Sequence, residues 1–174
     1  MATLPQVVRE EHKELRAHIE LLRKVADSIG SASTESIREG VGQAHSFLIH
    51  ELIPHAQAEE QVLYPTVGRL LRALEATETM SRDHLEVIRL TEELESLRLH
   101  LFYTPASQSD EQALRRVLYG LYAIIKLHLA KEEEIYLPIL EARFPAEEVD
   151  GLVEAMKRTD TEAKSSLRMI DPRE

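Results

Sequence analysis

The chain has 174 residues; 43% of them are hydrophobic, 30% are charged, 5% are aromatic and six are glycine. This composition is typical of a helical bundle, so we expect an all-α protein with its own hydrophobic core. A formal net charge of -10 argues against a nucleic-acid partner, and the absence of cysteine excludes disulfides, thiolate metal sites, iron–sulfur clusters and thiol catalysis. The N-terminal residues show no signal-peptide pattern and no segment approaches the roughly 20 apolar residues of a membrane span, so we expect a cytoplasmic protein that binds no membrane.

The first predicted helix covers residues 5–29, where apolar side chains recur with the period of a helix. His12 lies within this apolar face. The inward positions are Val8, His12, Leu15, Ile19, Leu22 and Ala26. The polar segment 30–34 predicts a loop, in which Ser33 or Thr34 caps the next helix.

The second predicted helix covers residues 35–64 and carries His55 and Glu59, one turn apart, on its apolar face. The inward positions are Ile37, Val41, Ala44, Leu48, Leu52, His55, Glu59 and Val62. Pro54 lies in the helix interior, where it lacks the N–H of a regular turn, so we expect a kink just before His55.

Pro65 and Gly68 are expected to end the second helix, and residues 66–79 show a mixed pattern with one short helical turn. A third helix then extends to about residue 101 and carries another histidine on its apolar face. The inward positions of this helix are Met80, His84, Val87, Ile88, Thr91 and Leu94.

A loop at residues 102–109 precedes the fourth helix, for which Ser109 and Gln112 predict a capping box. This helix extends to a break expected at Phe144 and Pro145. Its inward positions are Leu114, Val117, Leu121, Ile124, His128, Glu132, Ile135 and Ile139. A histidine and a carboxylate on a core face need compensation for their desolvation, and a metal ion compensates both.

The tail predicts a fifth amphipathic helix over about residues 146–170. Its apolar positions are Val149, Leu152, Val153, Met156, Ala163 and Leu167. The helix is expected to cover one side of the bundle or to form an oligomer contact. We therefore divide the chain into a four-helix bundle at residues 1–143 and a C-terminal helical extension at 144–174, packed on the bundle in a monomer or homodimer.

The second and fourth helices contain a repeated segment. HAQAEEQVLYP from His55 aligns without a gap with HLAKEEEIYLP from His128, 73 residues later, and the lone histidines His12 and His84 are 72 residues apart. A helix–loop–helix unit present twice predicts an up-down-up-down antiparallel four-helix bundle. The side chains predicted to meet in its middle are His12, His55, Glu59, His84, His128 and Glu132.

This set suits a pair of metal ions. Each ion would take two imidazoles, one from each helix of a hairpin or across the bundle, while both carboxylates bridge and a water-derived oxygen completes the centre. Imidazole and carboxylate ligands admit iron, zinc, manganese or copper. Two bridging carboxylates beside oxygen ligands favour redox-capable iron.

The order and spacing of these motifs resemble the hemerythrin-like family, specifically bacterial proteins with HHE cation-binding domains, over about residues 7–140. The matching segments are EEHKELRAHI, LIPHAQAEEQVLYP, MSRDHLEVI and HLAKEEEIYLPIL. The resemblance implies an antiparallel four-helix bundle with two non-haem iron ions, joined by an oxo or hydroxo bridge, that binds dioxygen. It further implies that the four histidines are terminal ligands and that Glu59 and Glu132 bridge.

The chain departs from the oxygen-carrying members of the family at two positions. Those carriers have a further histidine one turn before the third-helix ligand, where this chain has Met80, so one ion keeps an open or water-filled position. Their last bridging carboxylate lies five residues after its histidine, which makes Glu133 a rival to Glu132. Helix phase favours Glu132, which lies about 40° from His128, over Glu133 at about 140°.

The other polar residues near these motifs are assigned to structural or surface roles. Residues expected to be solvated are His50, His100, Glu60, Glu133 and Glu134. His18 and His45 flank core faces, where a structural role is favoured over contact with the site. Arg16 either pairs with a buried carboxylate or lies at the surface. For Tyr64 and Tyr136, packing at a helix end is favoured over a hydrogen bond near the site.

The resulting functional hypothesis is a di-iron protein that binds dioxygen, nitric oxide or peroxide in a pocket lined by leucine, isoleucine and Met80. Two alternatives remain: an enzyme that decomposes peroxide, and an iron or oxygen sensor that signals through the fifth helix. The chain contains no Glu-x-x-His motif, which argues against a ferritin-like oxidase.

Overall fold

The computed structural model describes residues 4–143 and 146–170, and the side chains of these residues except those of 146–150 and 167–170. Every regular element in these ranges is helical, so the all-α prediction is confirmed. The break expected at Phe144 and Pro145 lies outside the described residues, as do the side chains of Val149 and Leu167.

The first helix, α1 (Leu4–Ser28), buries the apolar face expected for it, including His12. Gly30 follows with a φ of 84°, a conformation that glycine adopts without strain. Ser33 caps the second helix, because its side chain accepts a 3.2 Å hydrogen bond from the backbone N–H of Ser36.

The second helix is longer than predicted and contains two π turns. Its consecutive segments are α2 (Thr34–Phe47), η1 (Leu48–Leu52), α3 (Ile53–Ala58), η2 (Glu59–Leu63) and α4 (Tyr64–Leu71). The prediction that Pro65 and Gly68 end the helix is wrong, since the helix continues to Leu71 and is followed by Arg72, whose φ is 53°.

The π turns explain how prolines are accommodated inside this helix. Pro54 and Pro65 each occupy the second position of an α segment that follows a π turn. At the second turn the backbone N–H of Tyr64 bonds to the carbonyl of Glu59, five residues back. This wider winding makes room for a ring that lacks an N–H and would clash with the carbonyl four residues before it.

The remaining helices follow after a short 3-10 turn. They are η3 (Leu74–Thr77), α5 (Glu78–Tyr103), α6 (Gln108–Lys131), the π turn η4 (Glu132–Tyr136), α7 (Leu137–Arg143) and α8 (Ala146–Ile170). The capping box of α6 consists of Ser107 and Asp110, so the prediction of Ser109 and Gln112 is wrong by two residues. Ser107 is the residue in extended conformation directly before the helix, which is the position a cap requires.

The π turns η2 and η4, which begin at Glu59 and Glu132, also shift the buried positions by one residue toward the C-terminus. A π turn takes about one more residue than an α turn, so side chains after it are rotated relative to a regular α-helix. Leu63 at the end of η2, Tyr136 at the end of η4 and Leu140 beyond it are buried, each one position later than the predicted Val62, Ile135 and Ile139. Ile135 is instead 52% exposed.

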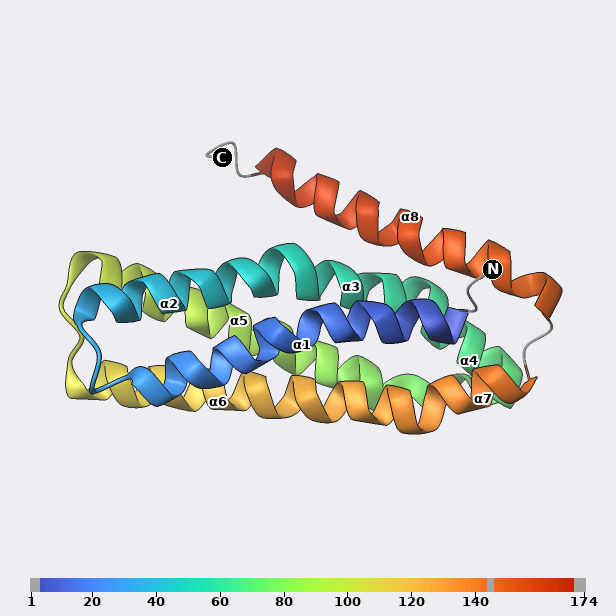
Figure 1. Ribbon diagram of the computed structural model, residues 1–174, viewed down its shortest axis with the longest axis horizontal. Helices are drawn as coiled ribbons and strands as arrows, with labels where there is room; N and C mark the ends of the chain where they lie inside the picture. Colours follow the sequence, from blue (N-terminus) through green and yellow to red (C-terminus); the bar gives the residue numbers. More distant parts are fainter. Residues whose placement is uncertain (1–3, 144–145, 171–174) are drawn as a thin grey trace.

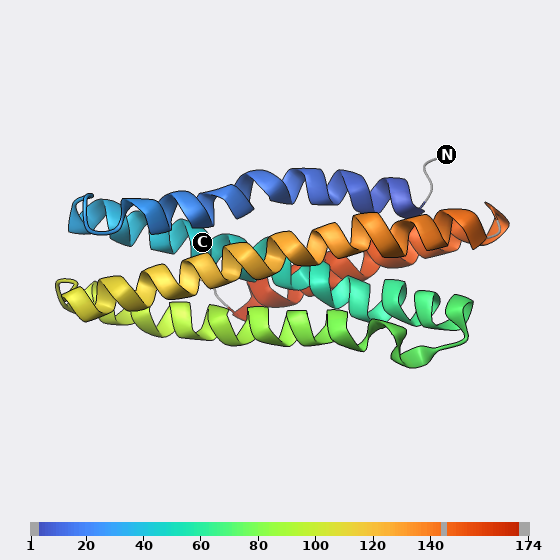
Figure 2. The same ribbon diagram turned by 90° about the horizontal axis from the view of Figure 1, so that it is seen from below.

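Figures 1 and 2 show the helices lying along the long axis of the molecule, with the chain turning back at each end. Helix α1 packs against α2 and α6, and α5 also packs against α2 and α6. Helix α8 lies along the outside of α3 (Figure 1) and also contacts α1. It buries Val153 and Met156, while Lys164 forms a 2.9 Å ion pair with Glu51.

The buried apolar residues form two cores. The first apolar core includes Leu15, Leu22, Leu48, Leu52, Val87, Leu94, Leu121, Ile125 and Leu129. The second apolar core includes Leu4, Val8, Leu63, Tyr64, Met80, Leu137, Val153 and Met156. Ligand positions lie where the two cores meet: His12 follows Val8 of the second core and precedes Leu15 of the first, and His84 follows Met80 of the second and precedes Val87 of the first.

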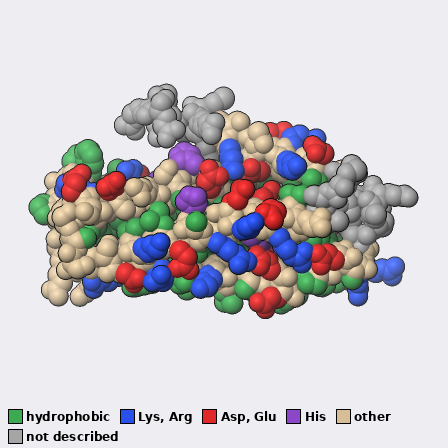
Figure 3. Space-filling view, viewed as in Figure 1, with side chains coloured by type: hydrophobic (Ala, Val, Ile, Leu, Met, Phe, Trp, Pro, Cys, Tyr) green, Lys and Arg blue, Asp and Glu red, His purple; other side chains and the backbone are tan. Residues whose placement is uncertain are grey.

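None of the described helices is both long enough and apolar enough to span a membrane. On the face shown in Figure 3, acidic and basic side chains are interspersed along the helices.

Candidate metal centre

The structure brings all six predicted ligand residues together in the interior, and none of them is more than 7% exposed. We call these residues the inner cluster: His12 on α1, His55 on α3, Glu59 on η2, His84 on α5, His128 on α6 and Glu132 on η4. The first hairpin consists of α1 and the second helix, and the second hairpin consists of α5 and the helix that begins with α6. Each of these helices contributes at least one residue of the inner cluster.

One half of the inner cluster consists of His12, His55 and Glu59, whose ligand atoms lie within 4.8 Å of one another. Glu59 Oε1 is 3.0 Å from His55 Nε2 and 3.7 Å from His12 Nε2. Both histidines belong to the first hairpin, so the imidazoles pair within a hairpin and not across the bundle.

The other half consists of His84, His128 and the same Glu59. Glu59 Oε2 is 3.4 Å from His84 Nε2. Glu132 has its Oε2 3.2 Å from His12 Nε2 and its Oε1 3.5 Å from His128 Nε2. Each glutamate therefore directs its two oxygens toward different hairpins, which is the arrangement that a bridging carboxylate needs.

The inner cluster fits a bound cation, because four of its buried atoms have no hydrogen-bond partner despite their close neighbours. These atoms are His12 Nε2, His55 Nε2, Glu59 Oε1 and Glu132 Oε2. Buried polar atoms are almost always satisfied, so an unpaired group of this kind needs an explanation such as an ion. Nitrogen and oxygen lone pairs converging on one space can all be satisfied by a metal.

The carboxylates and imidazoles of the inner cluster shift one another's pKa values. Burial alone lowers the pKa of His12, but the carboxylates of Glu132 and Glu59 beside it raise that pKa to about 9. Burial likewise raises the pKa of Glu59, but the charge of His55 and contacts with its histidine neighbours lower it well below its usual range. Metal binding at His12 would therefore have to displace a proton from its imidazole.

Glu133 lies outside the inner cluster, in agreement with the helix-phase argument for Glu132. Its side chain is 22% exposed and accepts a 3.0 Å hydrogen bond from His12 Nδ1. It also accepts hydrogen bonds of 2.8 and 2.6 Å from Arg16. Arg16 is exposed at the surface and also pairs with this partly buried carboxylate, so the structure shows elements of both roles considered for it.

A carboxylate faces the Nδ1 atom of every histidine in the inner cluster. We call these residues the outer carboxylates: Glu133 at 3.0 Å from His12, Glu11 at 3.3 Å from His55, Glu60 at 2.8 Å from His84 and Asp83 at 3.0 Å from His128. Glu60 and Glu133, assigned to a solvated face, are only partly exposed and each contacts a histidine of the inner cluster, and the sequence reasoning did not identify Glu11 or Asp83. Glu134 is exposed, as predicted.

The repeat contains a signal for the outer carboxylates. Glu11 precedes His12 as Asp83 precedes His84, and a second glutamate follows both Glu59 and Glu132. Extending the comparison of the two halves by one residue on each side of the ligands would have identified all four.

Tyr64 is a further member of the site, so the less favoured of the two roles considered for it, a hydrogen bond near the site, is the one observed. Its buried hydroxyl donates a 2.8 Å hydrogen bond to Glu132 Oε1 and lies 3.1 Å from His128 Nε2. A regular α-helix would place Tyr64 about 140° from Glu59, but the π turn η2 between them brings it inside. Tyr136 does pack at a helix end, where its hydroxyl donates to the carbonyl of Ala76.

The remaining histidines lie away from the inner cluster. His18 is exposed and stacks on a phenylalanine, while His45 is half-buried and lies 3.3 Å from Glu95. His50 is half-buried and His100 is exposed.

A cavity of about 20 Å³ adjoins the inner cluster on the side of the first apolar core. Its lining residues are Leu52, His55, Ala56, Glu59, His84, Val87, Ile125, His128 and Leu129. This space holds about one molecule of water size. The predicted pocket was to include Met80, which instead lies fully buried in the second apolar core.

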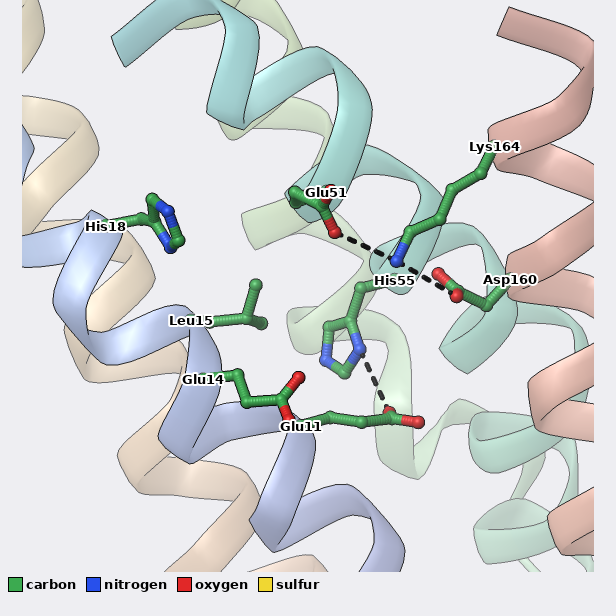
Figure 4. Close-up of a pocket in the computed structure, with 8 residues that line it drawn as sticks. All are labelled: Glu11, Glu14, Leu15, His18, Glu51, His55, Asp160 and Lys164. Carbon is green, nitrogen blue, oxygen red and sulfur yellow. Dashed lines mark ion pairs between the residues drawn. The ribbon is translucent and has the colours of Figure 1, made fainter. Parts of the chain in front are cut away.

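A larger pocket of about 320 Å³ lies outside His55, between α1, the second helix and α8. Figure 4 shows Glu11 paired with His55 at its inner side, and Lys164 of α8 between Glu51 and Asp160. The outer side of His55 is therefore bordered by charged residues, whereas the 20 Å³ cavity is largely apolar.

The family model described as "Hemerythrin HHE cation binding domain" matches residues 3–140 of the chain. Neither the curated proteins nor the solved structures contain a match to this chain. The resemblance noted over residues 7–140 is confirmed by this match, and the His/Glu cluster is the part of the chain suited to hold a cation. Because the match spans most of the chain, the protein belongs to the hemerythrin HHE cation-binding family.

Proposed function

We propose that this protein is an up-down-up-down four-helix bundle that holds two iron ions in the inner cluster. His12 and His55 would bind one ion and His84 and His128 the other, with Glu59 and Glu132 between them. The observation that carries this proposal is the set of four buried, unpaired nitrogen and oxygen atoms that converge from both hairpins. Imidazole and carboxylate without thiolate is a ligand set that suits iron.

The proposed activity is the binding of dioxygen or a related small ligand, nitric oxide or peroxide. Bound iron would supply the redox chemistry that makes this binding possible. The chain supplies the surroundings: Leu52, Val87 and Ile125 keep one side of the centre apolar, and Tyr64 places a hydroxyl proton at Glu132 Oε1. The 20 Å³ cavity beside the histidines offers space for a ligand of this size.

Iron analysis and an optical spectrum of protein loaded anaerobically with ferrous iron test this proposal. We expect about two equivalents of iron per chain and a new absorption band when nitric oxide is added. Binding of one equivalent or less, or the absence of any adduct, would contradict the proposal. Nucleic acid and membrane are not expected partners, and a cytoplasmic location and a monomeric or homodimeric state remain predictions.

Peroxide decomposition is a second candidate, favoured by the position of Tyr64. Burial and the charges of Glu59 and Glu132 raise the pKa of Tyr64 well above its usual range, so its hydroxyl stays protonated and able to donate at the centre. Oxygen evolution from peroxide by the iron-loaded protein tests this activity, with Tyr64→Phe as the matched variant. Turnover no greater than that of free iron would exclude the enzyme.

A further inference from the structure

The outer carboxylates connect the helices around the inner cluster in a closed ring. Each one belongs to a different helix from the imidazole that it contacts. The contacts run from Glu11 on α1 to His55, from Glu60 on η2 to His84, from Asp83 on α5 to His128, and from Glu133 on η4 back to His12. Because an ionised carboxylate can only accept, each contact places the imidazole proton on Nδ1 and leaves Nε2 directed inward.

Two of the outer carboxylates are also paired with cations. Arg16 lies 2.6 Å from Glu133, and Lys131 forms an ion pair with Asp83. Within the described part of the chain, Glu11 and Glu60 form no ion pair with lysine or arginine. The layer around the centre is therefore acidic overall, although it contains cations.

The net formal charge of the inner cluster, the outer carboxylates and their two paired cations can be compared with the charge of the metal ions. The inner cluster and the outer carboxylates together contain six carboxylate groups, whose negative charge is partly offset by the positive charges of Arg16 and Lys131. With neutral imidazoles, the net formal charge is -4. Two divalent cations carry the opposite charge. Since uncompensated charge in and beside a buried site is costly, this balance favours two divalent ions over one when the imidazoles are neutral.

We propose that the outer carboxylates, together with Arg16 and Lys131, match the charge of the site to two divalent cations and so set metal affinity and reduction potential. This inference rests on the proposed metal centre. The outer carboxylates act as positioning residues, because they reach the metal only through an imidazole. Loss of such a contact typically weakens metal binding by about 10- to 100-fold.

The ion pair between Asp83 and Lys131 provides a matched test, because both of its members act on the same imidazole, that of His128. Asp83→Asn keeps an acceptor oxygen for His128 Nδ1 but removes a negative charge. Lys131→Gln breaks the same ion pair but removes a positive charge. A purely structural role for the pair predicts weaker binding in both variants, whereas charge matching predicts opposite effects.

The experiment is a titration of metal-free protein with zinc in competition with a chelator, which requires no redox activity. Circular dichroism first confirms that each variant is folded. We expect two equivalents in the wild type, binding at least tenfold weaker in Asp83→Asn and Glu60→Gln, and tighter binding in Lys131→Gln. These differences should shrink as sodium chloride is raised, because salt screens partly exposed charges.

The reduction potential of iron-loaded protein is the second measurement. A negative charge near the centre stabilises the higher oxidation state, so Asp83→Asn should raise the potential and Lys131→Gln should lower it. A wild type that does not take up two ions would contradict the proposed function itself. A wild type that binds two ions, with variants that do not separate in opposite directions, would overturn the charge-matching inference alone.

Discussion

Replacing Tyr64 by phenylalanine removes one hydroxyl from the site and keeps the ring that packs in the second apolar core. The hydroxyl is buried, and its acceptor, Glu132, is fully buried as well. A hydrogen bond to a charged group contributes about 1.5–3 kcal/mol, so we expect the metal-free protein to lose about 2 kcal/mol of unfolding free energy. In a chain of this size that loss lowers Tm by about 4–8 °C.

Thermal unfolding of the metal-free protein, followed by circular dichroism, measures this effect. Tyr119→Phe is the matched control, because its hydroxyl bonds to Asp27 at the surface and its loss should change stability by less than about 0.5 kcal/mol. Equal melting temperatures for Tyr64→Phe and Tyr119→Phe would show that the buried hydroxyl contributes nothing to the site.

The pH dependence of stability gives a second signature of Tyr64. Burial and the charges of Glu59 and Glu132 raise its pKa well above the ordinary value of 10.0. Above pH 10 the unfolded chain therefore loses this proton while the folded chain keeps it, so stability falls as pH rises. Tyr64→Phe should lose stability less steeply over this range, and an unchanged slope would refute the assignment.

Three further predictions concern the metal, the small ligand and the tail. Glu59→Ala and His128→Ala should each lower the amount of bound iron, measured by metal analysis, whereas Glu134→Ala at an exposed position should leave it unchanged. An iron content equal to that of the wild type in Glu59→Ala or His128→Ala would mean that the ligands are misassigned. Ala56→Leu should fill the 20 Å³ cavity and weaken nitric oxide binding at least tenfold without changing the iron content. Nitric oxide affinity equal to that of the wild type would mean that the ligand binds elsewhere. Removal of iron should reduce hydrogen-exchange protection in α8, which contacts the segments that carry His55 and Glu59; unchanged protection would remove the basis for a sensor role.

That the residues of the inner cluster meet could be predicted, because packing alone would not select histidine and glutamate at the repeated positions on apolar faces. Leucine or isoleucine would serve better than His12 or Glu132 on a face that carries no ion. The approximate extents of the helices were likewise predictable from hydrophobic periodicity, which depends on many residues and tolerates local errors.

The parts that escaped prediction all depend on local geometry. Periodicity assumes a constant rotation per residue, so it could not anticipate that a π turn moves Tyr64 inward and Ile135 outward. The outer carboxylates escaped for a different reason. Glu60 and Glu133 have the composition of a solvated surface, and only the approach of another helix shows that an imidazole lies against them.

The π turns also make the site sensitive to chain length. Deleting one residue from Glu59–Leu63 would restore a regular α-helix with Tyr64 about 40° from Glu59 and therefore still on the inward face. Inserting one residue there would instead turn the following residues by about 100° relative to Glu59. Tyr64 would lose its hydrogen bond to Glu132, and Leu63 and Val67 would leave the second apolar core, although no ligand had been substituted. Among homologous chains, an exact count of residues from the ligand histidine to the following proline is thus as informative about this centre as the identity of the ligands.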